Sequence, residues 1–436
     1  MPGPNTDPKR RAAHDRAREQ ATEIARALQD AGHVAYFAGG CVRDDLLGLD
    51  PTDYDVATDA TPDRVQELFG RTSEVGAHFG VVLVHPQPKA QAVEVATFRA
   101  DGEYTDNRRP DRVTFSTPEA DAQRRDFTIN ALFLDPVASE SSTAPLLEQV
   151  IDFVGGVSDL KAGVVRAVGD PEARLKEDHL RALRAVRFAA RLGFRIDEAT
   201  GEAIRDHASE LAGVSRERIG EEIRKMMADT YRSVAVWQLQ YLDLDAPVFD
   251  QPHSNASAPR TLGRLGDDSS FPLCLAALAL DRGLVEVSQV AGLVEAWRRA
   301  LMLSNQERDA LKAVLEGYAQ LERAWGSMSI AEQKRTASAG WFPDAMILLS
   351  ARDTVAMVRL SRQVEKLAAS PGGLAPRPLL DGDQLIAQGF RPGPRFGEVL
   401  GLLYDAQLEG RVGTLEEAID LARALFERAQ PGESDA

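Results

Sequence analysis

The chain has few cysteines and no long apolar run near its N-terminus. Cys41 and Cys274 are the only two cysteines among 436 residues, and they lie far apart in the sequence. Two such positions exclude a disulfide framework and a zinc knuckle. The first twenty residues are polar and rich in Arg, Lys, Asp and Pro. That composition excludes a signal peptide and a transmembrane segment there, so we expect a cytoplasmic protein.

Negative charge outnumbers positive charge. The chain carries 51 Lys and Arg against 67 Asp and Glu, a formal net charge of −16. This balance argues against a general nucleic-acid binder, because phosphate contacts need Lys and Arg. A local basic surface is still possible, since Arg clusters recur in the first half at Arg108-Arg109, at Arg124-Arg125 and from Arg181 to Arg195. These clusters are where we expect RNA or a triphosphate to bind.

The most informative stretch joins a glycine pair to two aspartates. Gly39 and Gly40 follow the apolar run 34–38 and precede residues with helical spacing, which indicates a strand, a tight turn and a helix start. Such a turn lets the backbone approach a ligand, and the free N–H groups of the helix favour a phosphate. Asp53 and Asp55 follow, and on a strand this spacing puts both carboxylates on one face. Paired carboxylates can hold the hard cations of a two-metal site.

Either half of this pattern alone is usually structural: a turn in the first case, a solvated loop in the second. In order, Gly-Gly-x-Val-Arg-Asp over 39–44 and Asp-x-Asp over 53–55 resemble the signature of the DNA polymerase beta nucleotidyltransferase superfamily. Within it, the pattern is similar to the bacterial-type (class II) tRNA nucleotidyltransferases, the CCA-adding enzymes, and to the related bacterial poly(A) polymerases. The resemblance runs over most of the chain and is most specific in the first 225 residues.

Two further segments match the superfamily near the expected sheet. Glu94, between two valines, stands where the superfamily has its third active-site carboxylate, although a solvent-facing strand residue would look the same. Residues 124–130 resemble the motif Arg-Arg-Asp-x-Thr-x-Asn, in which Arg125 could clamp triphosphate oxygens bidentately and Asp126 follows. A solvated charge pair is the alternative for this segment.

A charged segment from 101 to 111 has neither helical nor strand spacing, so it is expected to be a mobile surface loop. In the family, the same pattern is a flexible loop that adjusts the nucleotide site between C and A addition. The loop residues that match are Asp101, Gly102, Arg108, Arg109 and Asp111.

The segment Glu177-Asp178-x-x-Arg181 resembles the base-reading motif of the family. An ordinary helix with an ion pair between Asp178 and Arg181, three residues apart, would look much the same. Cytosine and adenine each present an amino donor beside an unprotonated ring nitrogen. A carboxylate that accepts and an arginine that donates would therefore admit C and A and reject U and G.

The resemblance implies template-independent addition of C and A to the 3′ end of the tRNA acceptor arm, from CTP and ATP, with release of pyrophosphate. It also implies two Mg²⁺ ions held by Asp53 and Asp55. A poly(A) polymerase, an enzyme that adds only A, and a non-catalytic RNA- or nucleotide-binding module remain as alternatives, and the oligomeric state is not predicted. The expected catalytic residues are Asp53, Asp55 and Glu94, and the expected nucleotide-binding residues are Gly39, Gly40, Arg43, Arg125, Asp126, Glu177, Asp178, Arg181, Arg184 and Arg187.

The predicted fold is an α/β (α+β) nucleotidyltransferase head with a small mixed sheet, followed by an all-α neck, body and tail. Helical spacing replaces strand spacing near residue 170 and continues from there. The expected boundaries are a disordered N-terminus over 1–20, the head over 21–170, the neck over 171–248, the body over 249–375 and the tail over 376–430.

Overall fold

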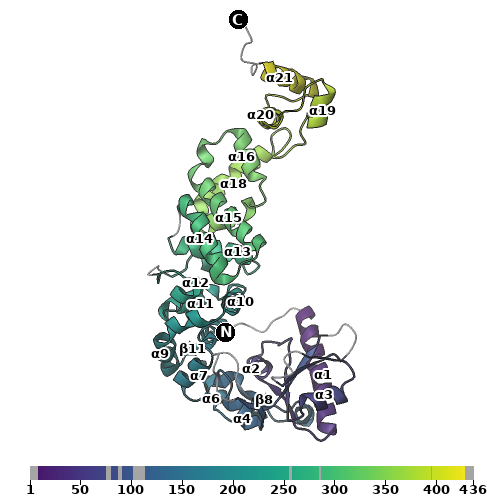
Figure 1. Ribbon diagram of the computed structural model, residues 1–436, viewed down its shortest axis with the longest axis vertical. Helices are drawn as coiled ribbons and strands as arrows, with labels where there is room; N and C mark the ends of the chain where they lie inside the picture. Colours follow the sequence, from purple (N-terminus) through teal and green to yellow (C-terminus); the bar gives the residue numbers. More distant parts are fainter. Residues whose placement is uncertain are drawn as a thin grey trace. The chain divides into compact units, whose positions relative to one another are not determined.

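The computed structural model describes residues 8–74, 80–86, 91–101, 113–254, 258–283, 286–393 and 395–427. The chain forms two compact units, one of Met1–Asn255 with Ala300–Met302 and one of Ala256–Arg299 with Leu303–Ala436. The larger sheet lies in the N-terminal part of the first unit, and most of the remaining chain is helical (Figure 1). The predicted mixed-sheet head followed by a helical remainder is therefore confirmed. The finer boundaries between neck, body and tail stay predictions.

The main sheet has seven strands in the order β3-β4-β5-β2-β1-β8-β9. It is mixed, because β2 and β5 run parallel while the other neighbouring strands run antiparallel. The strands of this sheet are β1 (Ala35–Ala38), β2 (Val56–Thr58), β3 (Thr72–Glu74), β4 (Val81–Val84), β5 (Val93–Thr97), β8 (Leu132–Leu134) and β9 (Val150–Asp152). Two smaller pairs are formed by β6 (Arg99–Asp101) with β7 (Val113–Phe115), and by β10 (Val164–Val165) with β11 (Arg195–Ile196).

Both faces of this sheet are covered by buried side chains. Neighbouring residues on a strand point to opposite faces, so they belong to different clusters. Phe37 and Val56 belong to one buried cluster, to which helix α1 (Pro8–Asp30) contributes. Ala38 and Ala57, the next residues on the same strands, belong to a second buried cluster. The central strands are therefore fixed from two sides, and the loops at their ends, which carry Gly39 and the aspartates, start from a rigid frame.

Helix α1 corrects one expectation. It begins at Pro8, so residues 8–20 are helical although the sequence suggested disorder over 1–20. Three of its polar side chains are tied to the segment 45–51: Arg11 pairs with Asp50 at 2.6 Å, His14 contacts a backbone oxygen at 3.0 Å, and Arg18 pairs with Asp45. The charges that suggested a solvated terminus are thus used in tertiary contacts.

The helices of the first unit surround the sheet and continue beyond it. They are α1, α2 (Gly40–Leu47), α3 (Pro62–Leu68), α4 (Pro118–Gln123), α5 (Pro136–Ser141), α6 (Gly156–Ala162), α7 (Pro171–Glu177), α8 (Leu180–Leu192), α9 (Glu198–Asp206), α10 (Arg216–Met227), α11 (Arg232–Tyr241) and α12 (Asp245–Phe249).

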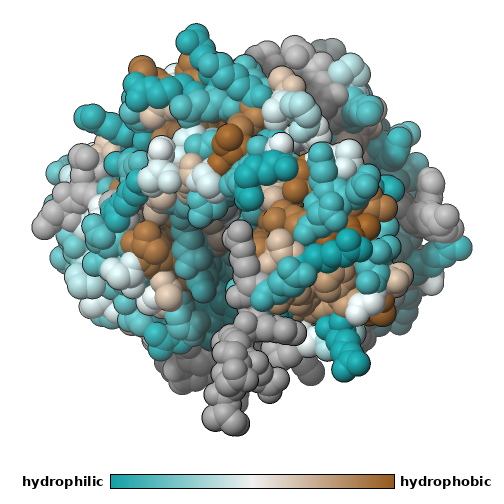
Figure 2. Space-filling view, turned by 90° about the horizontal axis from the view of Figure 1, so that it is seen from above, coloured by the Kyte–Doolittle hydropathy of each residue, from teal (hydrophilic) through white to brown (hydrophobic). Residues whose placement is uncertain are grey.

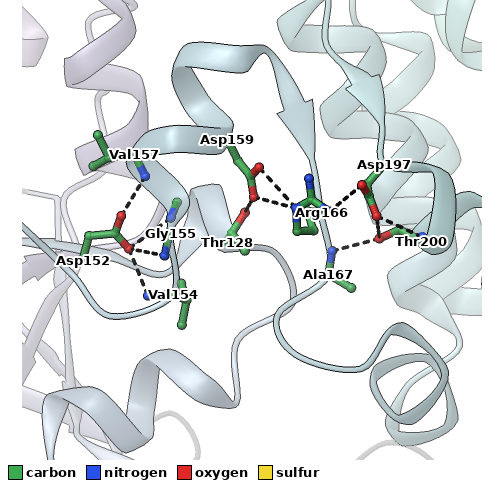
Figure 3. A network of polar contacts seen from close by, with 11 residues as sticks. Thr128, Asp152, Val154, Gly155, Val157, Asp159, Arg166, Ala167, Asp197 and Thr200 are labelled. Carbon is green, nitrogen blue, oxygen red and sulfur yellow. Dashed lines mark hydrogen bonds and ion pairs between the residues drawn. The ribbon is translucent and has the colours of Figure 1, made fainter.

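A polar network joins the sheet region to the helices that follow it (Figure 3). Arg166, just after β10, binds Asp159 of α6 at 3.1 Å and Asp197, the N-cap of α9, at 2.5 Å. Asp159 also accepts a hydrogen bond of 2.7 Å from Thr128. Nearby, Asp152 accepts hydrogen bonds from four backbone N–H groups at the start of α6. Arg166 therefore links segments from both sides of residue 170.

The second unit is helical in its described residues and contains a separate hydrophobic cluster built from residues between 380 and 422. Helix α13 is buried on all sides over Leu273–Leu280. Within the described ranges, no helix combines the length and apolarity needed to span a membrane. On the face drawn in Figure 2, hydrophilic side chains predominate, and hydrophobic ones gather most broadly to the right of the centre. The helices are α13 (Phe271–Asp281), α14 (Val287–Leu301), α15 (Asn305–Arg323), α16 (Ile330–Ala337), α17 (Phe342–Arg352), α18 (Thr354–Ala368), α19 (Gly382–Ala387), α20 (Phe396–Leu408) and α21 (Leu415–Glu427).

Candidate active site

A pocket of about 460 Å³ opens in the first unit, where the turn after β1 meets helix α8. It gathers eight of the ten expected nucleotide-binding residues together with Asp55, although these residues span almost 150 positions of the chain. The other two, Glu177 and Arg187, are not among its lining residues. The lining residues are Gly39, Gly40, Arg43, Asp55, Arg124, Arg125, Asp126, Asn130, Asp178, Arg181, Arg184 and Phe188.

The turn between β1 and α2 requires glycine at its first position. Gly39 is the N-cap of α2 and has φ 77°, a conformation that L side chains rarely adopt. A Cβ at Gly39 would lie 2.7 Å from Nη1 of Arg125 and 3.3 Å from the backbone oxygen of Asn130. Arg125 itself donates to that oxygen at 3.1 Å and to Asp121 at 3.0 Å. The absent side chain thus lets a held guanidinium approach the start of a helix, where an anion is favoured.

Arg43 is more buried than its expected role suggests. Its side chain is only 2% exposed and its Nε donates to Asp44 at 2.8 Å, while Nη1 donates to the side chain of Asn130. Its guanidinium also lies 4.9 Å from the ring centroid of Phe188. Asp44 in turn accepts a 2.9 Å bond from Arg191 of α8. These contacts favour a structural role for Arg43, which ties α2 to α8 at the wall of the pocket.

Two expected carboxylates lie in a loop rather than on a strand, because β2 begins only at Val56. The alternation is nevertheless that of an extended chain: Asp53 and Asp55 are exposed and Tyr54 between them is buried. The parallel register of β2 with β5 pairs Val56 with Val95, so the preceding Asp55 lies beside Glu94. Asp53, Asp55 and Glu94 together line a second, smaller hollow of about 250 Å³.

The electrostatics of these carboxylates suit a hard cation. Desolvation, the charge of Glu94 and that of Asp53 raise the pKa of Asp55 to about 6, although Arg125 opposes the rise. Like charges this close are costly unless a cation neutralises them, and carboxylate oxygens are the ligands that Mg²⁺ prefers. Among the described residues, no group of three or more His, Cys, Asp or Glu side chains is already arranged as a metal site. Asp53 instead accepts a hydrogen bond from Gln91.

The expected base-reading segment is not one continuous helix. Helix α7 ends at Glu177 and α8 begins at Leu180, and Asp178 between them has an extended backbone. The side-chain ion pair between Asp178 and Arg181, which an ordinary continuous helix would favour, is therefore not formed, although the Arg181 N–H donates to the Asp178 backbone oxygen at 3.0 Å. Asp178 accepts a hydrogen bond of 3.1 Å from the Leu180 N–H and pairs with Arg218 at 2.6 Å.

Arg181 is held separately. It binds Glu177 at 2.5 Å and the Arg174 carbonyl at 2.9 Å. Asp178 and Arg181 nevertheless both line the pocket, each fixed by its own partner.

Asp126 and Arg184, which both line the pocket, form an ion pair. Oδ2 of Asp126 accepts from Nε of Arg184 at 2.8 Å and pairs with Nη2 at 2.6 Å, while Oδ1 accepts from Asn130 at 3.0 Å. Burial alone would raise the pKa of Asp126. The charge of Arg184 and these hydrogen bonds outweigh burial and lower the pKa to about 2. Asp126 is therefore ionised at neutral pH and orients Arg184.

Phe188 is a lining residue that the sequence analysis did not single out. Its ring lies under three guanidinium groups, those of Arg43, Arg184 and Arg187, at 4.9, 5.4 and 4.3 Å from the centroid. Arg187 also binds Glu222 of α10 at 2.6 Å. Arg184 lies four positions before Phe188 on α8, and because residues four apart share a helix face, this spacing could have indicated the packing of Arg184 on the ring.

The expected flexible loop falls almost entirely outside the described residues. Gly102, Arg108, Arg109 and Asp111 are not described, and only Asp101 is, at the end of β6, where it pairs in register with Val113. The role of this loop stays a prediction.

Comparison with known proteins agrees with the family resemblance found in the sequence. A family model described as the poly A polymerase head domain matches residues 35–166, and one described as the probable RNA and SrmB-binding site of polymerase A matches residues 193–255. The CCA-adding enzyme of Limosilactobacillus fermentum is 33% identical over 404 residues, which cover 90% of this chain and 93% of that one. The chain belongs to the CCA-adding enzyme family. The resemblance found in the sequence is thus confirmed.

Two further members of the family illustrate the range of similarity. The CCA-adding enzyme of Lactobacillus helveticus is 45% identical over 208 residues, about half of each chain (48% and 49%). The crystal structure of the Bacillus stearothermophilus CCA-adding enzyme in complex with CTP has 28% identity and a TM-score of 0.73, over 95% of this chain and 99% of that one. Nucleotidyltransferases of this family generally use divalent metal ions.

Proposed function

We propose that the protein adds C and A to the 3′ end of tRNA from CTP and ATP, without a nucleic-acid template and with release of pyrophosphate. The observation that carries the proposal is one pocket in which the glycine turn, Asp55 and the Asp178–Arg181 segment meet. Relatives that match over 90% or more of this chain are CCA-adding enzymes, and one solved relative binds CTP.

The chemistry would take place beside Asp53, Asp55 and Glu94. Their oxygen donors and the raised pKa of Asp55 fit two Mg²⁺ ions, with Asp53 and Asp55 as ligands and Glu94 beside them. When bound, Mg²⁺ supplies the Lewis acidity that activates the RNA 3′-hydroxyl and neutralises the leaving pyrophosphate. The remaining contribution of the chain is positioning and charge.

The triphosphate would bind at the turn of Gly39 and Gly40. Arg125 lies beside this turn, held by Asp121, and Arg184 faces the same pocket, held by Asp126. Held guanidinium groups lose little further freedom when they bind phosphate oxygens. Arg43 is buried, and Arg187 pairs with Glu222 and does not line the pocket. We therefore assign both to positioning α2 and α8 rather than to direct contact with the triphosphate.

The base would be read by Asp178 and Arg181. Each Asp178 oxygen already accepts one hydrogen bond in the structure, so lone pairs remain for the amino group of C or A. Arg181 would donate to the ring nitrogen. A wrong base would leave these buried groups unpaired, which is how a site can reject it without a template. Glu177 holds Arg181 and is assigned to orientation.

Incubation of the purified protein with Mg²⁺ and labelled CTP or ATP tests the proposal. The substrates are tRNA transcripts that end before CCA, after the first C and after CC. We expect addition of C, C and then A, after which addition stops, and no product with Asp55→Asn. Long A tails on unstructured RNA would favour a poly(A) polymerase instead. Addition of A only to the CC-ended transcript would mean that another enzyme supplies the cytidines.

A further inference from the structure

A second hollow of similar size lies between α9 and α11, and its volume is about 470 Å³. It shares no lining residue with the candidate active-site pocket. Its volume is in the range of small-molecule sites. We call it the α9–α11 hollow, and the proposed addition reaction assigns it no role.

One wall of the α9–α11 hollow is an exposed aromatic pair. Trp237 and Tyr241 lie one turn apart on α11, with ring centroids 5.4 Å apart and planes only 11° from parallel. Their side chains are 47% and 58% exposed. Large aromatic side chains that remain in solvent together indicate a binding surface more often than single exposed residues do. A flat, stacked pair of this kind favours a planar ligand.

On the opposite wall, a glycine without a side chain leaves the hollow open. Gly201, in the middle of α9, lines it, and a Cβ there would meet Ile196 at 3.9 Å and Leu242 at 4.0 Å, which is ordinary contact. Packing therefore does not require glycine at this position. Glycine inside a helix also costs about 0.5–1 kcal/mol relative to alanine. A larger side chain at this position would extend into the hollow.

The polar groups of the hollow narrow the choice of ligand. Arg205 already covers Tyr241, with its guanidinium 4.9 Å from the ring centroid, which leaves Trp237 for a ligand. Gln238 also lines the hollow, and in the described part of the chain its Oε1 is buried without a hydrogen-bond partner. This acceptor needs a donor, which the amino group of a base can supply if the side chain shifts slightly.

Charge argues against a polyphosphate in the same place. The carboxylates of Glu198 and Glu202 line the hollow on the α9 side. Arg195 also lines it and lies in β11, just before the first turn of α9. A ligand that places an uncharged ring and an amino group in the hollow meets acceptors, whereas a triphosphate would meet two carboxylates. A nucleobase fits this arrangement better than a phosphate chain does.

All lining residues fall within 193–255, the segment that matches the family model described as a probable RNA and SrmB-binding site. Within this segment, we propose that the α9–α11 hollow binds a planar, amino-bearing nucleobase stacked on Trp237, either of a free nucleotide or of an unpaired position in RNA. Stacking on aromatic side chains is the usual way in which proteins hold unpaired bases. The site is separate from the catalytic pocket, so this proposal does not depend on the addition reaction.

The experiment uses the emission of Trp237 in the full chain. Emission from the three other tryptophans is removed by subtracting a Trp237→Phe variant, and the protein is titrated with AMP, CMP, UMP and hexaadenylate. We expect saturable quenching by AMP and CMP, and weaker quenching by UMP, which lacks the amino group. Tighter binding of hexaadenylate than of AMP would identify RNA as the source of the base, and equal binding per base would identify the free nucleotide.

Matched variants at Gly201 provide the control. Gly201→Leu should weaken binding by about 5- to 150-fold, the range for loss of one stacked base, whereas Gly201→Ala should bind like the wild type. Tyr241→Leu leaves the hollow open and should weaken binding less than Gly201→Leu does. All variants should keep the wild-type melting curve, which shows that they fold. Absence of saturable quenching, equal quenching in Gly201→Leu, or a Trp237 signal that changes only with protein concentration would overturn the proposal; the last would mean that two copies associate through α11.

Discussion

The ion pair between Asp126 and Arg184 makes a quantitative prediction about stability. In Asp126→Asn, the amide keeps the Oδ1 position, which accepts from Asn130 and from the Phe127 N–H. Its nitrogen replaces Oδ2, which accepts from two nitrogens of Arg184 at 2.8 and 2.6 Å. The NH₂ group of the new side chain then faces the N–H donors of Arg184, and the Arg184 guanidinium loses its counter-charge.

The magnitude follows from the pKa. Lowering the pKa of Asp126 from 3.8 to about 2 corresponds to roughly 2 kcal/mol of stability at neutral pH. Because the folded-state pKa is the lower one, this stabilisation is present above pH ~4 and is lost as the pH falls toward ~2. We therefore expect Asp126→Asn to unfold about 2 kcal/mol more easily at pH 7, with a difference that shrinks between pH 4 and pH 2.

Urea denaturation followed by tryptophan emission measures this difference. Trp237 is the only tryptophan within residues 1–255, so subtracting the Trp237→Phe signal reports on the first unit alone. Asp63→Asn, at an exposed position in the first turn of α3, serves as the matched control and should change stability little. A difference at pH 7 well below 1 kcal/mol, or one that grows as the pH falls, would refute the assignment.

Three further predictions concern activity. Asp55→Asn should abolish nucleotide incorporation while the melting curve stays normal, and near wild-type incorporation would exclude Asp55 as a metal ligand. Asp178→Ala should relax the choice between C or A and U or G by up to ~10⁴-fold, measured as kcat/KM for each nucleotide, whereas an equal loss for all four would indicate a structural carboxylate. Gly39→Ala should lose incorporation because its Cβ would displace Arg125, while Gly48→Ala, which shares the positive φ but has no atom within 4 Å of its Cβ, should lose only stability.

Local signals in the sequence predicted the frame of the site well. The glycine pair after an apolar run produced the turn between β1 and α2, and strand spacing produced a mixed sheet in the head. Residues from three separate motifs do line one pocket. These features depend on backbone conformation and hydrophobic period, which neighbouring residues largely determine.

Interactions between distant segments were not predictable in the same way. Arg43 was expected at the triphosphate, yet Asn130, 87 positions away, and Phe188 engage it. The segment 8–20 was expected to be disordered, yet its charges pair with residues near Asp50. In both cases the sequence shows a charged group but not which partner the fold brings to it.

The break at Asp178 shows how such a partner can alter local structure as well. Neither glycine nor proline, the residues that most often end a helix, occurs between Glu177 and Leu180. Asp178 instead caps the first turn of α8 through the Leu180 N–H and binds Arg218 of α10, 40 positions later. The ion pair and the cap together hold the carboxylate outside both helices, where it reaches the pocket. A continuous helix would have left Asp178 to pair with Arg181, and the two groups would then satisfy each other rather than a base.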